Sequence, residues 1–258
     1  MNYFVVTHHA LEWPLPSFMQ PISTVPAGEA VVDLSTDHPH LAGRGPELSE
    51  YATLFALRRH LQASWGASGR PADADMIGVG HYRRFPVIRP IGRPSDIYGV
   101  VSPEEFTTLP ADTFLPPTGS LLLPSICNVG TVLGQYGRNH VLRDLLHFTA
   151  IAIDLDVIDE RAAAQWLSQG VMVAAPSIGV YPAGWYVHVL EQLERVVEAF
   201  ESSAAVPRDG YQRRAVGFCL ERLHGMLLGQ LLSQWPGDRV LANPAVIVSD
   251  EGNYTLGG

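Results

Sequence analysis

The order of apolar and polar positions along the chain predicts short buried strands that alternate with amphipathic helices. NYFVVT at 2–7 and AVVDL at 30–34 are apolar and β-branched, which is typical of buried strands. The stretch 47–65 has apolar residues at helical spacing, and Pro46 suits a helix start. Strands are predicted at 2–7, 30–34, 76–80, 121–124, 171–181 and 239–250, and helices at 47–65, 103–108, 129–153, 159–168, 184–202 and 210–234.

This alternation predicts an α/β fold with a mostly parallel sheet flanked by helices, followed by a helical C-terminal half. A chain of 258 residues, 47% of them hydrophobic, is large enough for one sizeable core. We therefore expect a single domain over 1–258, made of an α/β half at 1–124 and a mainly helical half at 125–258. Residues 14–28 and 67–74 are predicted to be irregular because proline, glycine and polar residues interrupt them.

Charge and cysteine content narrow the classes of function. The formal net charge of −9 argues against nucleic acid or an anionic membrane as the main partner, although a local basic pocket is compatible with it. Cys127 and Cys219 form no CxxC pair and are expected to be reduced core thiols. The chain shows no secretory signal and no run of about 20 apolar residues, so we expect a cytoplasmic protein without a transmembrane segment.

The predicted strand at 76–80 runs directly into His81, Tyr82, Arg83 and Arg84. Ligands of open α/β sheets bind beyond the carboxyl ends of the strands, which is where these four side chains should lie. Two guanidiniums suit a phosphate or diphosphate, the phenol can stack on a base or sugar, and the imidazole can bind a metal or move a proton. The alternative is that these side chains face the core or pair with some of the chain's acidic residues.

Polar residues also follow two other predicted strands. Thr7, His8 and His9 end the first strand, and Asp33 lies near the end of the second. In a parallel sheet the carboxyl ends of the strands meet at one edge. These residues are therefore expected to lie near His81, although a lone histidine is more often structural.

Three helical segments carry further candidates. Ser49 and Glu50 lie in the first turn of a predicted helix, where a glutamate often serves only the helix dipole. Tyr136, His140 and Asp144 fall on one face of the helix predicted at 129–153, which could equally be a half-exposed surface.

In the last long helix, Glu221 and Arg222 interrupt an apolar run, so Glu221 is either paired structurally or functional. The chain contains no P-loop and no dinucleotide-binding fingerprint, since GVG at 78–80 lacks a third glycine. The acidic stretch IDLDVIDE at 153–160 follows a helix rather than a strand and reads as a solvated turn.

Five stretches, in this order along the chain, resemble a known family. They are VVTHH at 5–9, PELSEYATLFAL at 46–57, IGVGHYRRF at 77–85, QYGRNHVLRDL at 135–145 and YQRRAVGFCLERL at 211–223. The sequence resembles a bacterial glycosyltransferase family of capsular, exopolysaccharide and O-antigen gene clusters, long catalogued as a domain of unknown function. The resemblance implies a GT-A-like fold, with a nucleotide-sugar-binding half at 1–124 and an acceptor-side half at 125–258.

The resemblance also implies a nucleotide-diphosphate sugar donor, expected to be a UDP-sugar, and a hydroxyl acceptor. Relatives are linked to galactofuranose or other hexose transfer. Where GT-A enzymes carry an Asp-x-Asp metal motif, this chain carries HYRR, so Mn²⁺ or Mg²⁺ is allowed but not required. Arg83 and Arg84 are expected to bind the diphosphate, and His81 and Tyr82 to line the donor site. Thr7, His8 and Asp33 are expected near the nucleoside, with Ser49, Glu50, Glu221 and Arg222 in a second layer around the site. The candidates for the catalytic base are His140, Asp144 and Glu221.

Two departures from the family pattern affect the acceptor side. The family commonly has asparagine where this chain has Arg44-Gly45-Pro46, and 171–185 lacks the family's His…Asn element. The acceptor could be a polysaccharide, a lipid-linked glycan or a small natural product. Two other functions remain open: a metal-dependent hydrolase or lyase that uses His8, His9 and His81, and a non-catalytic nucleotide-sugar-binding protein.

Overall fold

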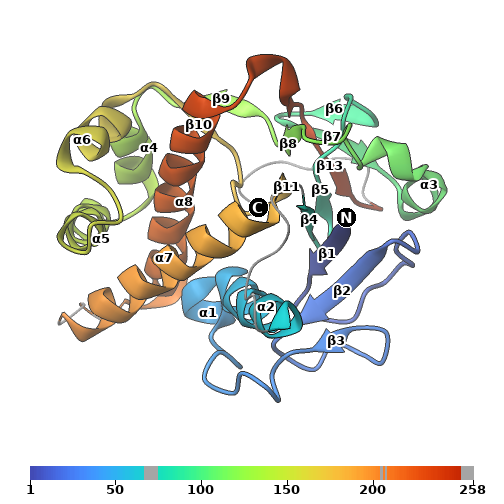
Figure 1. The fold of residues 1–258 in the computed structure, drawn as a ribbon, viewed down its shortest axis with the longest axis horizontal. Helices are drawn as coiled ribbons and strands as arrows, with labels where there is room; N and C mark the ends of the chain where they lie inside the picture. Colours follow the sequence, from blue (N-terminus) through green and yellow to red (C-terminus); the bar gives the residue numbers. More distant parts are fainter. Residues whose placement is uncertain (67–74, 204–205, 207, 251–258) are drawn as a thin grey trace.

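The computed structural model describes residues 1–66, 75–203, 206 and 208–250, so the loop predicted at 67–74 lies outside the described residues. The strands are β1 Asn2–Val6, β2 Met19–Ser23, β3 Val32–Asp33, β4 Met76–His81, β5 Arg84–Phe85, β6 Arg93–Ser95, β7 Tyr98–Val101, β8 Leu121–Leu123, β9 Ile126–Asn128, β10 Val171–Val173, β11 Gly179–Pro182, β12 Val240–Ala242 and β13 Ala245–Val248. The α-helices are α1 Gly45–Leu48, α2 Tyr51–Ser64, α3 Pro103–Thr108, α4 Val132–Asn139, α5 Leu142–Asp154, α6 Glu160–Ser168, α7 Ala183–Ser202 and α8 Ala215–Gln234. Figure 1 shows α4 to α8 gathered on one side of the main sheet, with β6, β7 and α3 at the opposite end.

The main sheet is built around β4. Strands β3, β2, β1 and β4 lie side by side and are parallel, which places the carboxyl ends of all four at one edge. On the other side of β4, β11 runs antiparallel to both β4 and β8, and β12 pairs in parallel with β8. The predicted α/β class with a mostly parallel central sheet is confirmed, with antiparallel partners at β5, β6 and β11.

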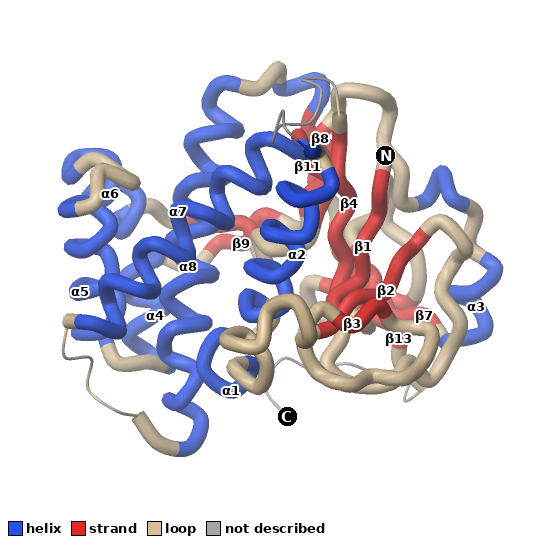
Figure 2. Tube along the Cα trace, turned by 60° about the horizontal axis from the view of Figure 1, so that its bottom comes forward, coloured by secondary structure: helices blue, strands red, loops and turns tan. Residues whose placement is uncertain are grey.

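Side chains of β1 alternate between two cores, as the two-residue period of a strand requires. Phe4 and Val6 face the larger core, which includes residues of α2, α5, α7 and α8. Tyr3 and Val5 face a smaller core that contains Phe106 of α3. Because both faces are covered, the strand reads in the sequence as an uninterrupted apolar run rather than as an alternating one. Figure 2 shows the helices grouped beside the strands, with α3 alone on the far side of the sheet.

Several sequence predictions need correction. Residues 14–28 are not wholly irregular, because β2 pairs with β1 despite Pro21. The helix predicted at 47–65 is broken at Ser49, and the helix predicted at 129–153 is two helices separated at His140 and Val141. The strand at 171–181 is two strands on either side of Pro176, and the strand at 239–250 is likewise β12 and β13.

The two halves of the chain share one sheet. Strand β11, from the half predicted to be mainly helical, lies between β4 and β8, and β12 and β13 also join the main sheet. None of the helices of the described part of the chain is both long and apolar enough to span a membrane.

Candidate functional site

A cavity of about 500 Å³ lies at the carboxyl edge of the parallel strands. The ends of β1, β2 and β4 form one wall, and α1 with the start of α2 forms another. The lining of the cavity is completed by the segment that precedes β11 and by Arg214, which directly precedes α8. The residues that line it are Val6, Thr7, His8, Thr24, Val25, Gly43, Gly45, Pro46, Ser49, Glu50, Ala52, Thr53, His81, Tyr82, Arg83, Arg84, Ala175, Ser177, Ile178 and Arg214.

Strand β4 carries the HYRR residues into this cavity. His81 is its last residue and pairs with Val6 of β1, and the Tyr82 amide donates to the Val6 carbonyl at 2.8 Å. The two glycines of β4 have a packing role: a Cβ on Gly78 would lie 2.2 Å from the Tyr3 ring, and one on Gly80 would lie 2.9 Å from the Phe85 ring. The glycines of GVG at 78–80 therefore leave room for the Tyr3 and Phe85 rings to pack on β4, and they do not form a phosphate-binding loop.

An aromatic cluster forms where β1 and β4 end. The Tyr82 ring centroid lies 4.5 Å from that of His9, 4.7 Å from that of His81 and 5.1 Å from that of His8. Burial, reinforced by the positive charges of Arg84, His8 and Arg83, lowers the pKa of His81 to about 3. Burial and the neighbouring positive charges also lower the pKa of His8. His81 is therefore a neutral imidazole at physiological pH, able to donate from one nitrogen and accept at the other.

Three arginines reach the cavity from two distant parts of the chain. The Arg83 guanidinium lies 5.3 Å from the Tyr82 ring centroid, and that of Arg84 lies 5.9 Å from the Tyr98 ring. Arg214 comes from the end of the short 3-10 helix Gly210–Arg214, directly before α8. Its charge depresses the pKa of both His8 and His81, which places it near the β1 and β4 ends.

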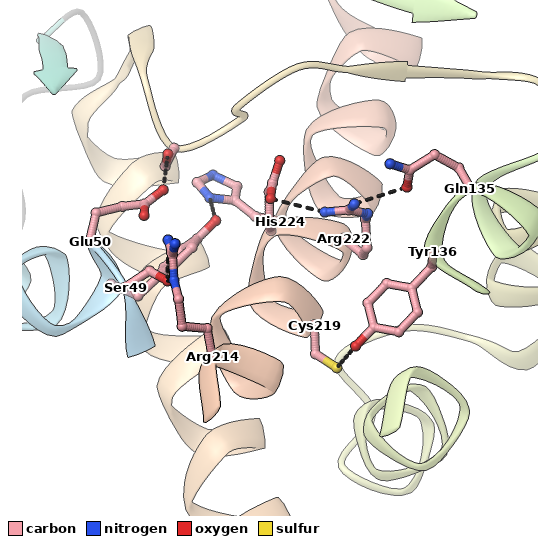
Figure 3. A network of polar contacts seen from close by, with 11 residues as sticks. Ser49, Glu50, Gln135, Tyr136, Arg214, Cys219, Arg222 and His224 are labelled. Atoms are coloured by element: carbon pink, nitrogen blue, oxygen red, sulfur yellow. Dashed lines mark hydrogen bonds and ion pairs between the residues drawn. The ribbon is translucent and has the colours of Figure 1, made fainter. Parts of the chain in front are cut away.

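Glu50 lies at the α1–α2 junction, near Ser49 and Arg214 (Figure 3), and it lines the cavity. Ser49 ends α1 with φ +57°, a left-handed conformation that costs a non-glycine residue roughly 1–2 kcal/mol. Two nitrogens of the Arg214 guanidinium donate to Ser49 Oγ at 3.2 and 3.1 Å. Gly217 of α8 packs tightly against the junction, since a Cβ there would lie 2.5 Å from Ser49 Oγ.

Glu50 follows Ser49 and opens α2 as its N-cap residue. Ser177 donates its hydroxyl hydrogen to Glu50 Oε1 at 2.9 Å. Burial raises the pKa of Glu50, and the negative charge of Glu221 adds to the rise, while Ser177 and Arg84 oppose it. Glu50 is the sole carboxylate among the described residues that line the cavity.

The comparisons with known proteins bear on the fold. No protein-family model matches the chain, and no curated protein matches it either. Among solved structures, the chain is similar to one described as the apo structure of WbbM, a bifunctional glycosyltransferase, with a TM-score of 0.76 and 17% sequence identity. The chain has the fold of a glycosyltransferase structure. The alignment covers 96% of this chain and 45% of the WbbM chain, so the chain spans less than half of WbbM.

The structure brings eight of the residues predicted from the sequence into this cavity. Those that line it are Thr7, His8, Ser49, Glu50, His81, Tyr82, Arg83 and Arg84. Asp33 ends β3 at the same sheet edge, but it is exposed, does not line the cavity, and accepts from the Ser35 amide at 2.7 Å. His140, Asp144, Glu221 and Arg222 do not line the cavity either.

Two of those four residues, His140 and Asp144, are engaged elsewhere. Tyr136, His140 and Asp144 do not share one helix face, because the helix ends at His140, whose ring stacks 4.0 Å from that of Phe218. Arg208 donates two hydrogen bonds, of 3.0 and 2.7 Å, to the Asp144 carboxylate.

Glu221 and Arg222 form an ion pair at 2.9 Å beside the cavity. Arg222 is buried and also donates to Gln135 Oε1 at 2.9 Å, which ties α8 to α4 (Figure 3). Glu221 still affects the site, because its negative charge raises the pKa of Glu50.

Sequence reasoning missed Arg214 and Ser177. Arg214 belongs to the stretch YQRRAVGF, whose two consecutive arginines before an apolar helix were the available signal. Ser177 follows Pro176, and the break that this proline makes in the strand at 171–181 was its signal.

The three histidines considered as metal ligands do not form a metal site. His9 Nδ1 lies 2.8 Å from the Ala10 carbonyl oxygen, and the rings of His8 and His81 are 6.3 Å apart. Within residues 1–66, 75–203, 206 and 208–250, no three His, Cys, Asp or Glu side chains are grouped so that they could hold a metal ion.

Proposed function

We propose that this chain is a glycosyltransferase that binds a nucleotide-diphosphate sugar in the cavity and moves the sugar to a hydroxyl acceptor. The observation that carries the proposal is the convergence of Arg83, Arg84 and Arg214 on one cavity of an acidic chain. Each guanidinium offers a planar fork of donors that matches phosphate oxygens. The glycosyltransferase-like fold supports the same conclusion.

The arginines would act on the leaving group. When the bond between the sugar C1 and the phosphate oxygen breaks, negative charge grows on the diphosphate. Donors already in place for that charge commonly supply the largest catalytic term. His81, held neutral, adds a hydrogen-bond donor without the cost of burying a charge. The ring of Tyr82 offers a face on which the base or sugar can stack.

The nucleoside would lie toward the ends of β1 and β2, where Thr7, His8 and Thr24 line the cavity. Uridine is the expected base, and a polysaccharide, a lipid-linked glycan or a small natural product is the expected acceptor. A divalent ion bound to the diphosphate is compatible with the site, and its contribution is open to direct measurement.

The test is a thermal-shift panel of UDP, GDP, CDP, dTDP and their sugars, each with Mn²⁺ or with EDTA. A ligand at about 100 times its dissociation constant adds about 2.7 kcal/mol of stability, or roughly 5–10 °C for a chain of this size. We expect one nucleotide family to shift wild type, and the shift to disappear in the double variant Arg83→Ala/Arg84→Ala. Arg143→Ala, on the exposed face of α5, is the matched control and should keep the shift.

A shift that persists in EDTA would assign the diphosphate to the arginines, and a shift that needs Mn²⁺ would add a metal. Binding without any turnover of donor, including its hydrolysis, would support the non-catalytic function instead. If no nucleotide shifts wild type, the proposed function is wrong.

A further inference from the structure

Within the proposed function, the structure also indicates which group removes the proton from the acceptor. The three base candidates from the sequence do not line the cavity: Asp144 is held by Arg208, His140 packs against Phe218, and Glu221 pairs with Arg222. Glu50 does line it, and no other described residue brings a carboxylate there.

The surroundings of Glu50 fix its side chain in place. On the N-terminal side of Glu50, Ser49 accepts two hydrogen bonds from Arg214 and packs closely against Gly217 of α8. On the other side Ser177 donates to Glu50 Oε1, and the Glu50 backbone amide also hydrogen-bonds to the carboxylate. A carboxylate has about four lone-pair sites, so these two donors leave it room to accept from another partner in the cavity.

The segment that carries Ser177 is itself rigid. The Tyr181 hydroxyl lies 2.8 Å from the Pro176 carbonyl oxygen and 2.7 Å from that of Ile178, so the two carbonyls share its one hydrogen. Tyr186 donates to the carbonyl of Ser177 at 2.8 Å. Both tyrosines are buried, and their rings stack 5.3 Å apart. The position of Ser177, and with it that of the Glu50 carboxylate, is thus set by the core rather than by a mobile loop.

The charges around Glu50 suit proton uptake. Burial raises its pKa, and nearby Glu221 raises it further, so the carboxylate is more basic than an ordinary exposed glutamate. The hydrogen bonds from the Glu50 backbone and from Ser177, and the positive charge of Arg84, oppose part of the rise. A carboxylate whose pKa is raised accepts a proton from a hydroxyl more readily than an ordinary one.

We propose that Glu50 is the general base, with Ser177 and Glu221 as its positioning and tuning residues. The Glu50 carboxylate takes the proton of the acceptor hydroxyl. The freed oxygen forms a bond to C1 of the sugar, and the bond between C1 and the phosphate oxygen breaks. Its electron pair leaves with the nucleoside diphosphate, whose charge the arginines take up. This single displacement inverts the configuration at C1.

The experiment compares Glu50→Gln and Glu50→Ala with wild type, using UDP-galactose, UDP-glucose and UDP-N-acetylglucosamine as donors. Water and p-nitrophenyl glycosides serve as acceptors, release of UDP is the rate readout, and UDP affinity is measured by calorimetry. We expect turnover to fall 10²–10⁴-fold in Glu50→Gln, the range that a general base contributes, with UDP affinity within threefold of wild type. Glu198→Gln, on an exposed position of α7, is the matched control and should keep full turnover.

Two further readouts separate a base from a structural role. Azide needs no proton removed before it attacks C1, so it should restore UDP release in Glu50→Ala at least tenfold and give a glycosyl azide. Glu221→Gln should move the acid limb of the rate profile to lower pH, because it removes a charge that raises the pKa of Glu50.

Turnover of Glu50→Gln within threefold of wild type, lack of rescue by azide, or retained configuration at C1 would overturn the assignment of Glu50 while leaving glycosyl transfer intact. Loss of turnover in Glu221→Gln, with Glu50→Gln active, would make Glu221 the base instead. Wild type that binds UDP but turns over no donor, with water or with azide, would refute both this inference and the proposed transfer activity. Wild type that binds no nucleotide would refute the proposed function itself.

Discussion

The contact between α8 and the α1–α2 junction leads to the sharpest stability prediction. A methyl group on Gly217 would lie 2.5 Å from Ser49 Oγ and 3.2 Å from the Leu48 carbonyl carbon. The second contact is with backbone, and that backbone is already held in a left-handed turn at Ser49. Gly217→Ala must therefore displace the Ser49 hydroxyl from its hydrogen bonds with Arg214 or move α8 away from the junction, at a cost of about 1–3 kcal/mol for an overpacked site.

Gly229 provides the matched control on the same helix. It is exposed, and a Cβ there would meet nothing within 4 Å, so Gly229→Ala should gain the helix propensity of alanine, about 1 kcal/mol. Gly217→Ala gains at most the same amount and loses the overpacking cost. The two variants should therefore differ by about 1–3 kcal/mol in the free energy of unfolding, or roughly 2–12 °C in Tm.

Urea unfolding at neutral pH measures this difference, with an unchanged m-value as evidence that both variants unfold as wild type does. Because the junction positions Glu50, Gly217→Ala should also lower turnover, whereas Gly229→Ala should not. A Gly217→Ala variant as stable as Gly229→Ala would show that α8 does not press on Ser49, and the positioning argument for Glu50 would lose its support.

Two other predictions concern buried charge. Glu194→Ala should cost about 3–5 kcal/mol in urea unfolding, because it leaves the buried Arg58 guanidinium without its carboxylate partner. Glu201→Ala breaks a more exposed ion pair with Arg44 and should cost under about 1 kcal/mol. Equal losses in the two variants would contradict this ranking. Burial lowers the pKa of His224, whose Nδ1 lies 3.1 Å from the Tyr51 hydroxyl, to about 3. The unfolded chain binds this proton from about pH 6.5 downward and the folded chain does not, so stability should fall as pH drops from 6.5 toward 3, by up to about 1.4 kcal/mol per pH unit. Urea midpoints against pH should be flatter in His224→Gln, and parallel curves would contradict a neutral buried imidazole.

The sequence by itself determined the strand ends of the candidate site. The sequence shows two apolar runs that stop at Thr7 and His81. A strand buried on both faces must be apolar, whereas the sheet edge that binds a ligand needs polar side chains, so these strand ends can be located from the local sequence alone. The parallel order of β1 and β4 then brings those ends together. The class of the fold followed from the same alternation of strands and helices.

Only the tertiary structure decided which helical residues belong to the site. The sequence treats 129–153 as one periodic helix. The structure breaks it at His140, whose ring stacks on Phe218 of α8, and neither proline nor glycine stands at positions 139–142 to signal the break. The same limit applies to 47–65, where an apolar period continues through Ser49 although the backbone turns there.

The contributions of Arg214 and Ser177 lie beyond what sequence spacing can show. Each is more than 100 positions from the α1–α2 junction. Ser177 contacts Glu50 and Arg214 contacts Ser49 because β11 packs beside β4 and α8 packs beside α1. Whether a polar side chain meets a cavity, another charge or solvent depends on those long-range contacts. Local patterns fix elements and their polar ends, while the assignment of a carboxylate to the cavity required the packed fold.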